Sequence, residues 1–345
     1  MMAEIWFWLL ALVLGIYAVL DGFDFGVGIL HFVVAKTQAE RDTLLRSIGP
    51  VWDGNEVWLV AAGGTLFGAF PALYAAAFSG FYLPLMLVLW LLLFRALAIE
   101  LRHHLDDLLW HQAWDVAFSA SSALLALFFG AALGNLVRGL PLNAEGVFFE
   151  PLWTDFRVGE TTGILDWFTL LVGLTATTAL AEHGALWLTL KTSGDVRERA
   201  SRLARQVWPV LVALTALTTF ASGVVQPRLV TNLSRYPIGL LCPLVATCGL
   251  VGMRVFLARS PFRAFLASSA FVLGLVGSAA FAIYPHALSA RVAGRELTIA
   301  AAAADESTLS AMLAWWLPGM ALASLYSFFI YSKMPKVFTT GGEEH

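Results

Sequence analysis

Two acidic clusters in the first part of the chain combine residue types and spacing that could do chemistry. The first is Asp21 with Asp24, and the second is Asp53 with Glu56. Each cluster lies within or beside an otherwise apolar stretch. A carboxylate in the hydrocarbon core of a membrane costs about 2.5–3.5 kcal/mol on insertion scales, so several of them in one chain indicate a use. Proton or ion movement is the use that these residue types favour.

The composition indicates what surrounds these acids. Hydrophobic residues make up 59% of the 345 residues and charged residues 13%, against about 45–50% and about 25% in a soluble domain. The chain is therefore expected to be a polytopic membrane protein. Its net charge is −3 and no basic face is concentrated anywhere, so no nucleic-acid partner is expected. The N-terminus lacks the basic region and the cleavage site of a signal peptide, and none is expected.

Nine apolar stretches predict nine transmembrane helices, because lipid admits only helices or closed barrels and these stretches lack the alternation of a barrel. They cover residues 5–34, 55–70, 74–99, 113–137, 166–190, 207–225, 237–257, 265–284 and 309–331. With the N-terminus outside and the C-terminus in the cytoplasm, 15 of the 21 Lys and Arg residues fall on the inner side. This positive-inside excess supports both the count of nine helices in an all-α fold and that orientation.

The orientation gives the acidic residues a depth in the membrane. At a rise of about 1.5 Å per residue, Asp21 and Asp24 lie about 24 and about 28 Å from the outer face of a core about 30 Å thick. Asp53 and Glu56 begin the second helix on the inner side, and Arg95 lies near the inner end of the third. We therefore expect one layer of ionisable groups near the cytoplasmic face.

Each acidic cluster also has a structural interpretation. The Asp53-x-x-Glu56 spacing is typical of a helix start, where carboxylates cap backbone N–H groups and suit the helix dipole. Asp21 and Asp24 could instead form a structural hydrogen bond or an ion pair with Arg95. Both interpretations stay open beside proton transfer.

Glycine and histidine give two further expectations. Gly22 and Gly26 lie one turn apart in the first helix, a spacing that allows another helix to approach closely. Of the seven histidines, His31 and His183 lie within apolar segments, and neither has a histidine four residues away. A haem held in a helical bundle needs buried axial ligands. We therefore expect no redox haem and no metal site on this chain.

Longer stretches around these residues resemble the N-terminal signature of subunit II of cytochrome bd-type quinol oxidases. They read LDGFDFGVG at 20–28, SIGPVWDGNEVW at 47–58, AAGG at 61–64 and AFP at 69–71, and shorter fragments continue to residues 190–192. The second half resembles the family through its helix number and through YP at 284–285 and LTI at 297–299. At 300–304 the chain has five alanines where the family has a polar stretch, so no outer-loop role is carried over.

The resemblance implies a function. It implies a subunit of a terminal quinol:oxygen oxidoreductase in the prokaryotic cytoplasmic (inner) membrane, a respiratory enzyme that reduces dioxygen to water and generates a proton gradient. The partner would be a larger subunit I that holds haem b and haem d and oxidises quinol. This chain would not be catalytic alone. It would support assembly and contribute a cytoplasmic proton-entry path, with membrane lipid and small accessory subunits as further candidate partners.

The resemblance also implies an architecture and a set of site residues. Two four-helix bundles, at 1–140 and 164–285, and a ninth helix at 305–335 would form one membrane domain, 1–345. Asp53 would be the proton-entry carboxylate, Asp21 or Asp24 the next acid, and Arg95 a charge partner, with Glu56 beside them. A proton-coupled transporter is the alternative from another class, although no internal repeat is evident. A purely structural subunit, whose acids only lock helices together, is the other.

Overall fold

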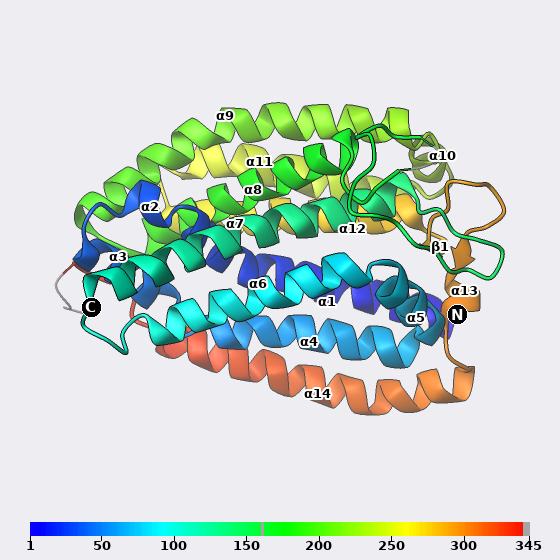
Figure 1. Ribbon diagram of the computed structural model, residues 1–345, viewed down its shortest axis with the longest axis horizontal. Coiled ribbons are helices and arrows are strands. Elements are labelled where there is room, and N and C mark those ends of the chain that lie inside the picture. Colours follow the sequence, from blue (N-terminus) through cyan, green and yellow to red (C-terminus); the bar gives the residue numbers. More distant parts are fainter. Residues whose placement is uncertain (160–161, 341–345) are drawn as a thin grey trace.

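The computed structural model describes residues 1–159 and 162–340, and these are mostly helical. Figure 1 shows the long helices running side by side along the longest axis of the molecule. The short helices α2 (His31–Val34) and α3 (Gln38–Ile48) lie at one end, which we call the α3 end. The N-terminus lies at the opposite end, with α5 (Pro71–Gly80), α10 (Arg228–Arg235) and α13 (Ile299–Ala302). We call this the N-terminal end.

Within the described residues, seven helices are long and apolar enough to span a membrane. They are α1 (Met2–Ile29), α6 (Tyr82–Leu101), α7 (Leu108–Arg138), α9 (Gly194–Val225), η1 (Pro237–Leu240) with α11 (Leu241–Phe256), α12 (Pro261–Ile283) and α14 (Glu306–Lys333). A helix pair, α4 (Trp52–Ala69) with α5, is bent by 118° and would raise the number to eight. The remaining long helix is α8 (Trp167–Lys191). The chain is thus a polytopic all-α membrane protein.

Several helix boundaries differ from the expected ones. The first helix stops at Ile29, and residues 31–34 form the separate helix α2. The helix expected over 74–99 is broken at Phe81, which places Pro84 in the first turn of α6. A proline fits there because N–H groups of the first turn have no partner within the helix. α9 begins at Gly194 rather than at 207, because its first turns are polar and an apolar-run criterion misses them.

Helix α1 is the centre of the fold. It packs against α4, α7, α8 and α12. At Gly26 an added Cβ would lie 2.1 Å from the carbonyl oxygen of Leu180 and 2.6 Å from the backbone nitrogen of Gly184, both on α8. This confirms the expected close approach of a second helix at this glycine.

Helix α3 begins with a capping box. The Thr37 hydroxyl accepts from the backbone N–H of Glu40, whose carboxylate accepts from the N–H of Thr37. Arg199 of α9 also binds this carboxylate. Burial raises the pKa of Glu40, but Arg199 and the N–H groups of Lys36 and Thr37 outweigh burial and leave that pKa below its ordinary value. The loop between α1 and α4 is thereby tied to α9.

The N-terminal end is closed by a short hairpin. Strands β1 (His286–Leu288) and β2 (Leu297–Thr298) pair antiparallel, with His286 opposite Thr298, and α13 follows directly. Asn232 of α10 donates to the carbonyl oxygens of Ala282 and Tyr284, at 3.1 and 2.6 Å. These hydrogen bonds anchor α10 to the end of α12, directly before the hairpin.

Candidate functional site: buried acids beside a cleft

Arg95 is the cation of the site. Its Nη2 donates to Asp21 Oδ1 at 2.5 Å and to Glu56 Oε1 at 2.9 Å, which brings together α6, α1 and α4. Arg95 and Asp21 are completely buried, whereas 24% of the Glu56 side chain is exposed. The guanidinium also lies 4.3 Å from the centre of the Phe25 ring. The structure thus brings ionisable groups of three separate segments together and pairs Arg95 with Asp21.

Asp24 has a different environment one turn further along α1. It is completely buried, and no ion pair joins it to any described residue. Its Oδ2 accepts from Asn55 Nδ2 at 2.8 Å, and its Oδ1 has no hydrogen-bond partner in the described part of the chain. Asp21 and Asp24 share a helix face, but only Asp21 is held by a cation. Of these two acids, Asp24 is therefore the one that can accept a proton without losing an ion pair.

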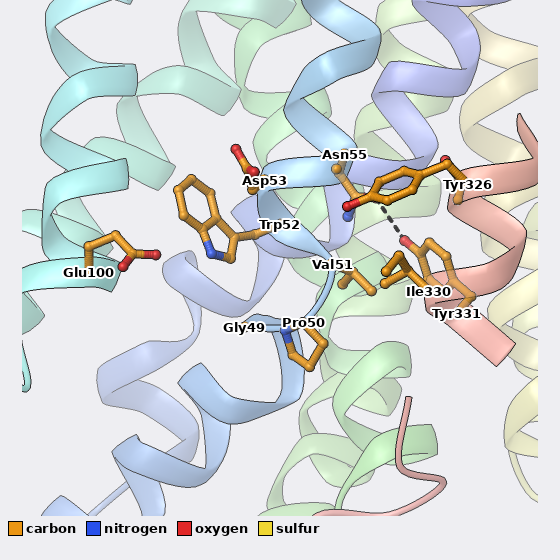
Figure 2. A pocket seen from close by; sticks show the side chains of 12 residues that line it. Gly49, Pro50, Val51, Trp52, Asp53, Asn55, Glu100, Tyr326, Ile330 and Tyr331 are labelled. Carbon is orange, nitrogen blue, oxygen red and sulfur yellow. Dashed lines mark hydrogen bonds between the residues drawn. The ribbon is translucent and has the colours of Figure 1, made fainter. Parts of the chain in front are cut away.

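A cleft of about 440 Å³ lies beside these acids. Its walls come from the start of α4, from α14 and from Glu100 at the end of α6. Figure 2 shows Asp53 and Asn55 close together on α4, with Asn55 directed towards Tyr331 and Asp53 directed away from it. Asp53 is exposed and makes no ion pair with the described residues. The cleft thus connects an exposed carboxylate with the residue that binds Asp24.

The capping interpretation of Asp53 and Glu56 was wrong. The residue before α4 is Val51, which makes no side-chain cap, and the Glu56 carboxylate binds Arg95 instead. Asp53 still lies in the first turn of α4, where a negative charge suits the helix dipole. The Ser/Thr-x-x-Glu signal that does form a capping box in this region belongs to Thr37 and Glu40.

Sequence reasoning missed Asn55 and Tyr331 as members of the site. Asn55 Nδ2 also donates to the carbonyl oxygen of Leu20 at 3.0 Å, and the Tyr331 hydroxyl donates to Asn55 Oδ1 at 2.9 Å. The local sequence feature that could have identified Asn55 was its position between the two acids Asp53 and Glu56. No local signal marks Tyr331, because it lies 276 residues away on α14.

A second ionic cluster, at the α3 end, was also missed. Asp115 of α7 is completely buried, and it accepts from Arg102 Nε at 2.6 Å and from Arg41 at 3.3 Å. His31 Nε2 forms a hydrogen bond of 2.8 Å with the same carboxylate. Arg102 also binds Asp42. Asp115 was visible as an acid at the start of an apolar stretch, but its partners come from three other segments.

A third cluster joins the loops at the N-terminal end. Arg138 binds Asp166 and also Glu150 Oε1, the latter at 2.8 Å, and Arg291 lies 3.4 Å from the same Glu150 oxygen. Burial raises the pKa of Glu150 more than the two arginines lower it. These contacts join α7, the start of α8 and the hairpin region, so we interpret this cluster as structural.

Glu182 of α8 is a buried acid that the sequence reasoning did not single out. It is 1% exposed, and its Oε2 has no hydrogen-bond partner in the described residues. No ion pair to Glu182 occurs in the described part of the chain. Alanines precede and follow it closely, at 181 and 185. The sequence feature that could have identified Glu182 was an isolated glutamate in an apolar segment, but the sequence analysis considered only the neighbouring His183.

A family model for cytochrome bd terminal oxidase subunit II matches residues 2–334. The chain belongs to this family. A probable cytochrome oxidase subunit 2 from Haemophilus influenzae is 33% identical over 96% of this chain and 93% of its own length. The cytochrome bd ubiquinol oxidase subunit 2 of Bacillus subtilis is 29% identical over 96% of both chains. The structure of bd oxidase from Geobacillus thermodenitrificans shares the fold, with a TM-score of 0.73 at 20% identity over 96% of this chain and 98% of that one.

Membership of the cytochrome bd subunit II family confirms the predicted function at the level of the complex. The chain is a subunit of a respiratory quinol oxidase, an oxidoreductase, and a multi-pass protein of the bacterial inner membrane. The family implies haem cofactors in the complex and a partner subunit I. The transporter alternative is not favoured.

The rings of His31 and His183, the two histidines within apolar segments of this cytochrome bd subunit, are completely buried and hydrogen-bonded within the chain. Both ring nitrogens of His183 are used within the chain, at 2.6 Å from Ser268 Oγ and 3.0 Å from the carbonyl oxygen of Val19. His31 Nε2 is held by Asp115, and the ring is completely buried beside Phe118. Within the described residues, no group of three or more His, Cys, Asp or Glu side chains could hold a metal ion.

Proposed function

We propose that this chain gives the oxidase its proton entry from the cytoplasm and stabilises a haem-bearing subunit I. The observation that supports the proposal most strongly is the cleft that runs from the exposed Asp53 to Asn55, which binds the buried Asp24. Quinol supplies electrons, and dioxygen takes up four electrons and four protons to give two waters. The protons for this step would enter at the cleft.

The residues of the site divide into two roles in this proposal. Asp53 collects protons at the mouth of the cleft, and Asp24 is the next acid because no described residue forms an ion pair with it. Asp21 and Glu56 are bound by Arg95 at 2.5 and 2.9 Å, so they set the charge around Asp24. Haem b and haem d would be held by the partner, since both ring nitrogens of His183 are used within the chain and the His31 ring is completely buried, with its Nε2 bound to Asp115.

We also propose nine spans, with the N-terminus outside. α4 and α8 would be the two spans beyond the seven, because α4 has 18 residues and α8 has 25, and both pack along α1. The first bundle would cover 1–140, the second 164–285 and the ninth helix 305–335. The 15 basic residues of the inner segments would then lie at the α3 end, on the side from which protons are taken.

Replacing Asp53 tests the proposed entry path. Asp53→Asn and Asp53→Ala should both fold normally, because the side chain is exposed and caps no helix. Both should lower oxygen consumption at saturating quinol several-fold and slow proton uptake into reconstituted vesicles equally, while haem absorbance stays unchanged. Asp106→Asn is the matched control, since Asp106 is an exposed acid of the α6–α7 loop and does not line the cleft. Normal turnover in both Asp53 variants, with proton delivery limiting the rate, would leave this chain a structural subunit.

A further inference from the structure

The Asn55 amide is fixed in one orientation. Its Nδ2 donates to Leu20 O and to Asp24 Oδ2, and its Oδ1 accepts from the Tyr331 hydroxyl. A flipped amide would place its oxygen against two other oxygens, which are acceptors. Asn55 is only 1% exposed, so breaking these bonds would leave buried polar groups unpaired.

This amide lies between the cleft and Asp24. Asn55 and Tyr331 both line the cleft, as Figure 2 shows, whereas Asp24 is completely buried and does not line it. A hydroxyl or a water can take up one proton while releasing another, but an amide would have to change its tautomer to do so. A proton carried by water in the cleft therefore reaches Asp24 when the amide has moved aside.

The Tyr331 ring is itself held in place. It packs edge-on against Trp187, with ring centres 6.4 Å apart, and Trp187 Nε1 donates to the carbonyl oxygen of Ser47 at 3.2 Å. The hydroxyl of Tyr331 is thus presented to Asn55 by a chain of contacts that runs from α14 through α8 to α3. Tyr326 lines the same cleft, but no hydrogen bond joins it to the described residues.

We propose that Tyr331 is a positioning residue whose hydrogen bond to Asn55 gates access from the cleft to Asp24. While the hydrogen bond between Tyr331 and Asn55 is present, the amide separates Asp24 from the cleft. When this hydrogen bond is broken, the amide rotates away and the Asp24 carboxyl becomes accessible from the cleft. The gate rests on the proposed role of the cleft in proton entry. Its test, however, measures access to Asp24 and not turnover, so the two can fail separately.

The experiment labels carboxyl groups in the assembled oxidase with a water-soluble carbodiimide, which forms a stable acylurea adduct, and maps them by peptide mass spectrometry. Labelling of Asp53, exposed at the cleft, is the internal standard. Tyr331→Phe should raise labelling of Asp24 about fivefold, the population change that corresponds to losing one hydrogen bond of about 1 kcal/mol. Asn55→Ala, which removes the amide, should raise it at least as much. Haem absorbance reports whether each variant assembles.

Tyr326→Phe is the matched control, because it removes, from the same cleft wall, a hydroxyl that takes no part in the hydrogen bonds of Asn55 to Leu20, Asp24 and Tyr331. It should leave labelling of Asp24 at the wild-type level. Equal labelling in wild type and Tyr331→Phe would overturn the role of Tyr331, and so would an equal rise in Tyr326→Phe. Absence of labelling in Asn55→Ala would show that the cleft does not lead to Asp24, and would overturn the gate as a whole.

Discussion

Arg95 determines what the acids around it can do. One guanidinium nitrogen serves both Asp21 and Glu56, and the whole side chain is buried. Removing one member of a buried ion pair leaves an uncompensated charge, which costs more than the pair contributes. Replacing Arg95 alone should therefore lower the stability of the protein more than replacing Arg95 and Asp21 together by neutral residues.

Arg95→Met tests this at the residue scale. It should destabilise the complex by about 3–5 kcal/mol, because Asp21 stays buried without a cation. The double variant Arg95→Met/Asp21→Asn should recover a large part of that loss. Thermal aggregation midpoints of the purified complex give the comparison. A double variant as unstable as the single one would mean that Arg95 stabilises the protein through packing on Phe25 and not through charge.

At the scale of elements, the close approach of α1 to α8 positions the helix that carries the acids. Gly26 and Gly184 meet backbone to backbone, so α8 lies against the same turns of α1 that carry Asp21 and Asp24. Asp21 and Asp24 lie on the opposite face of α1, where α6 supplies Arg95 and α4 supplies Asn55. Close approach of this kind depends on the absence of a side chain at the crossing point.

Gly26→Ala should separate α1 from α8. The added Cβ would lie 2.1 Å from a carbonyl oxygen and 2.6 Å from a backbone nitrogen, and backbone cannot move aside as a side chain end can. Overpacking of a core typically costs about 1–3 kcal/mol, so this backbone clash should reach at least that range. Yield and melting midpoint of the complex report the loss. Gly63→Ala on α4 is the control, since nothing lies within 4 Å of its added Cβ, and equal stability of the two variants would refute the close contact.

For the whole molecule, the orientation in the membrane decides whether the cleft faces the cytoplasm. Glu145 lies exposed in the segment between α7 and α8, and Asp106 lies exposed in the segment between α6 and α7. The segment with Glu145 follows the C-terminal end of α7, and the segment with Asp106 precedes its N-terminal end, so the two lie at opposite ends of this helix. In the proposed topology, the first is outside and the second is inside.

Single cysteines in a background with Cys242 and Cys248 replaced by alanine test this topology. A membrane-impermeant maleimide should label Glu145→Cys in intact spheroplasts and Asp106→Cys only in inverted vesicles. The reason is that the bilayer admits no charged reagent to the inner side of a sealed vesicle. The reverse pattern would place the cleft outside and exclude proton entry from the cytoplasm.

The amino-acid sequence determined the class of protein and the position of its acids along the chain. Long apolar stretches specify membrane helices because every backbone polar group must be satisfied inside lipid, and a spacing of three residues places Asp21 and Asp24 on one helix face. These are local properties, so they are readable without a fold. The long signature around residues 20–58 also identified the family, which the family match confirmed.

Only the tertiary structure decided which partner each acid has. Arg95 binds Asp21 and leaves Asp24 to Asn55, and Tyr331 completes that contact from the far end of the chain. Side chains that far apart in sequence meet through helix packing, and periodicity says which face a residue occupies but not which helix covers that face. The Gly26 crossing, the break at Phe81 and the partners of Asp115 have the same origin. Each depends on how helices from distant parts of the chain pack together.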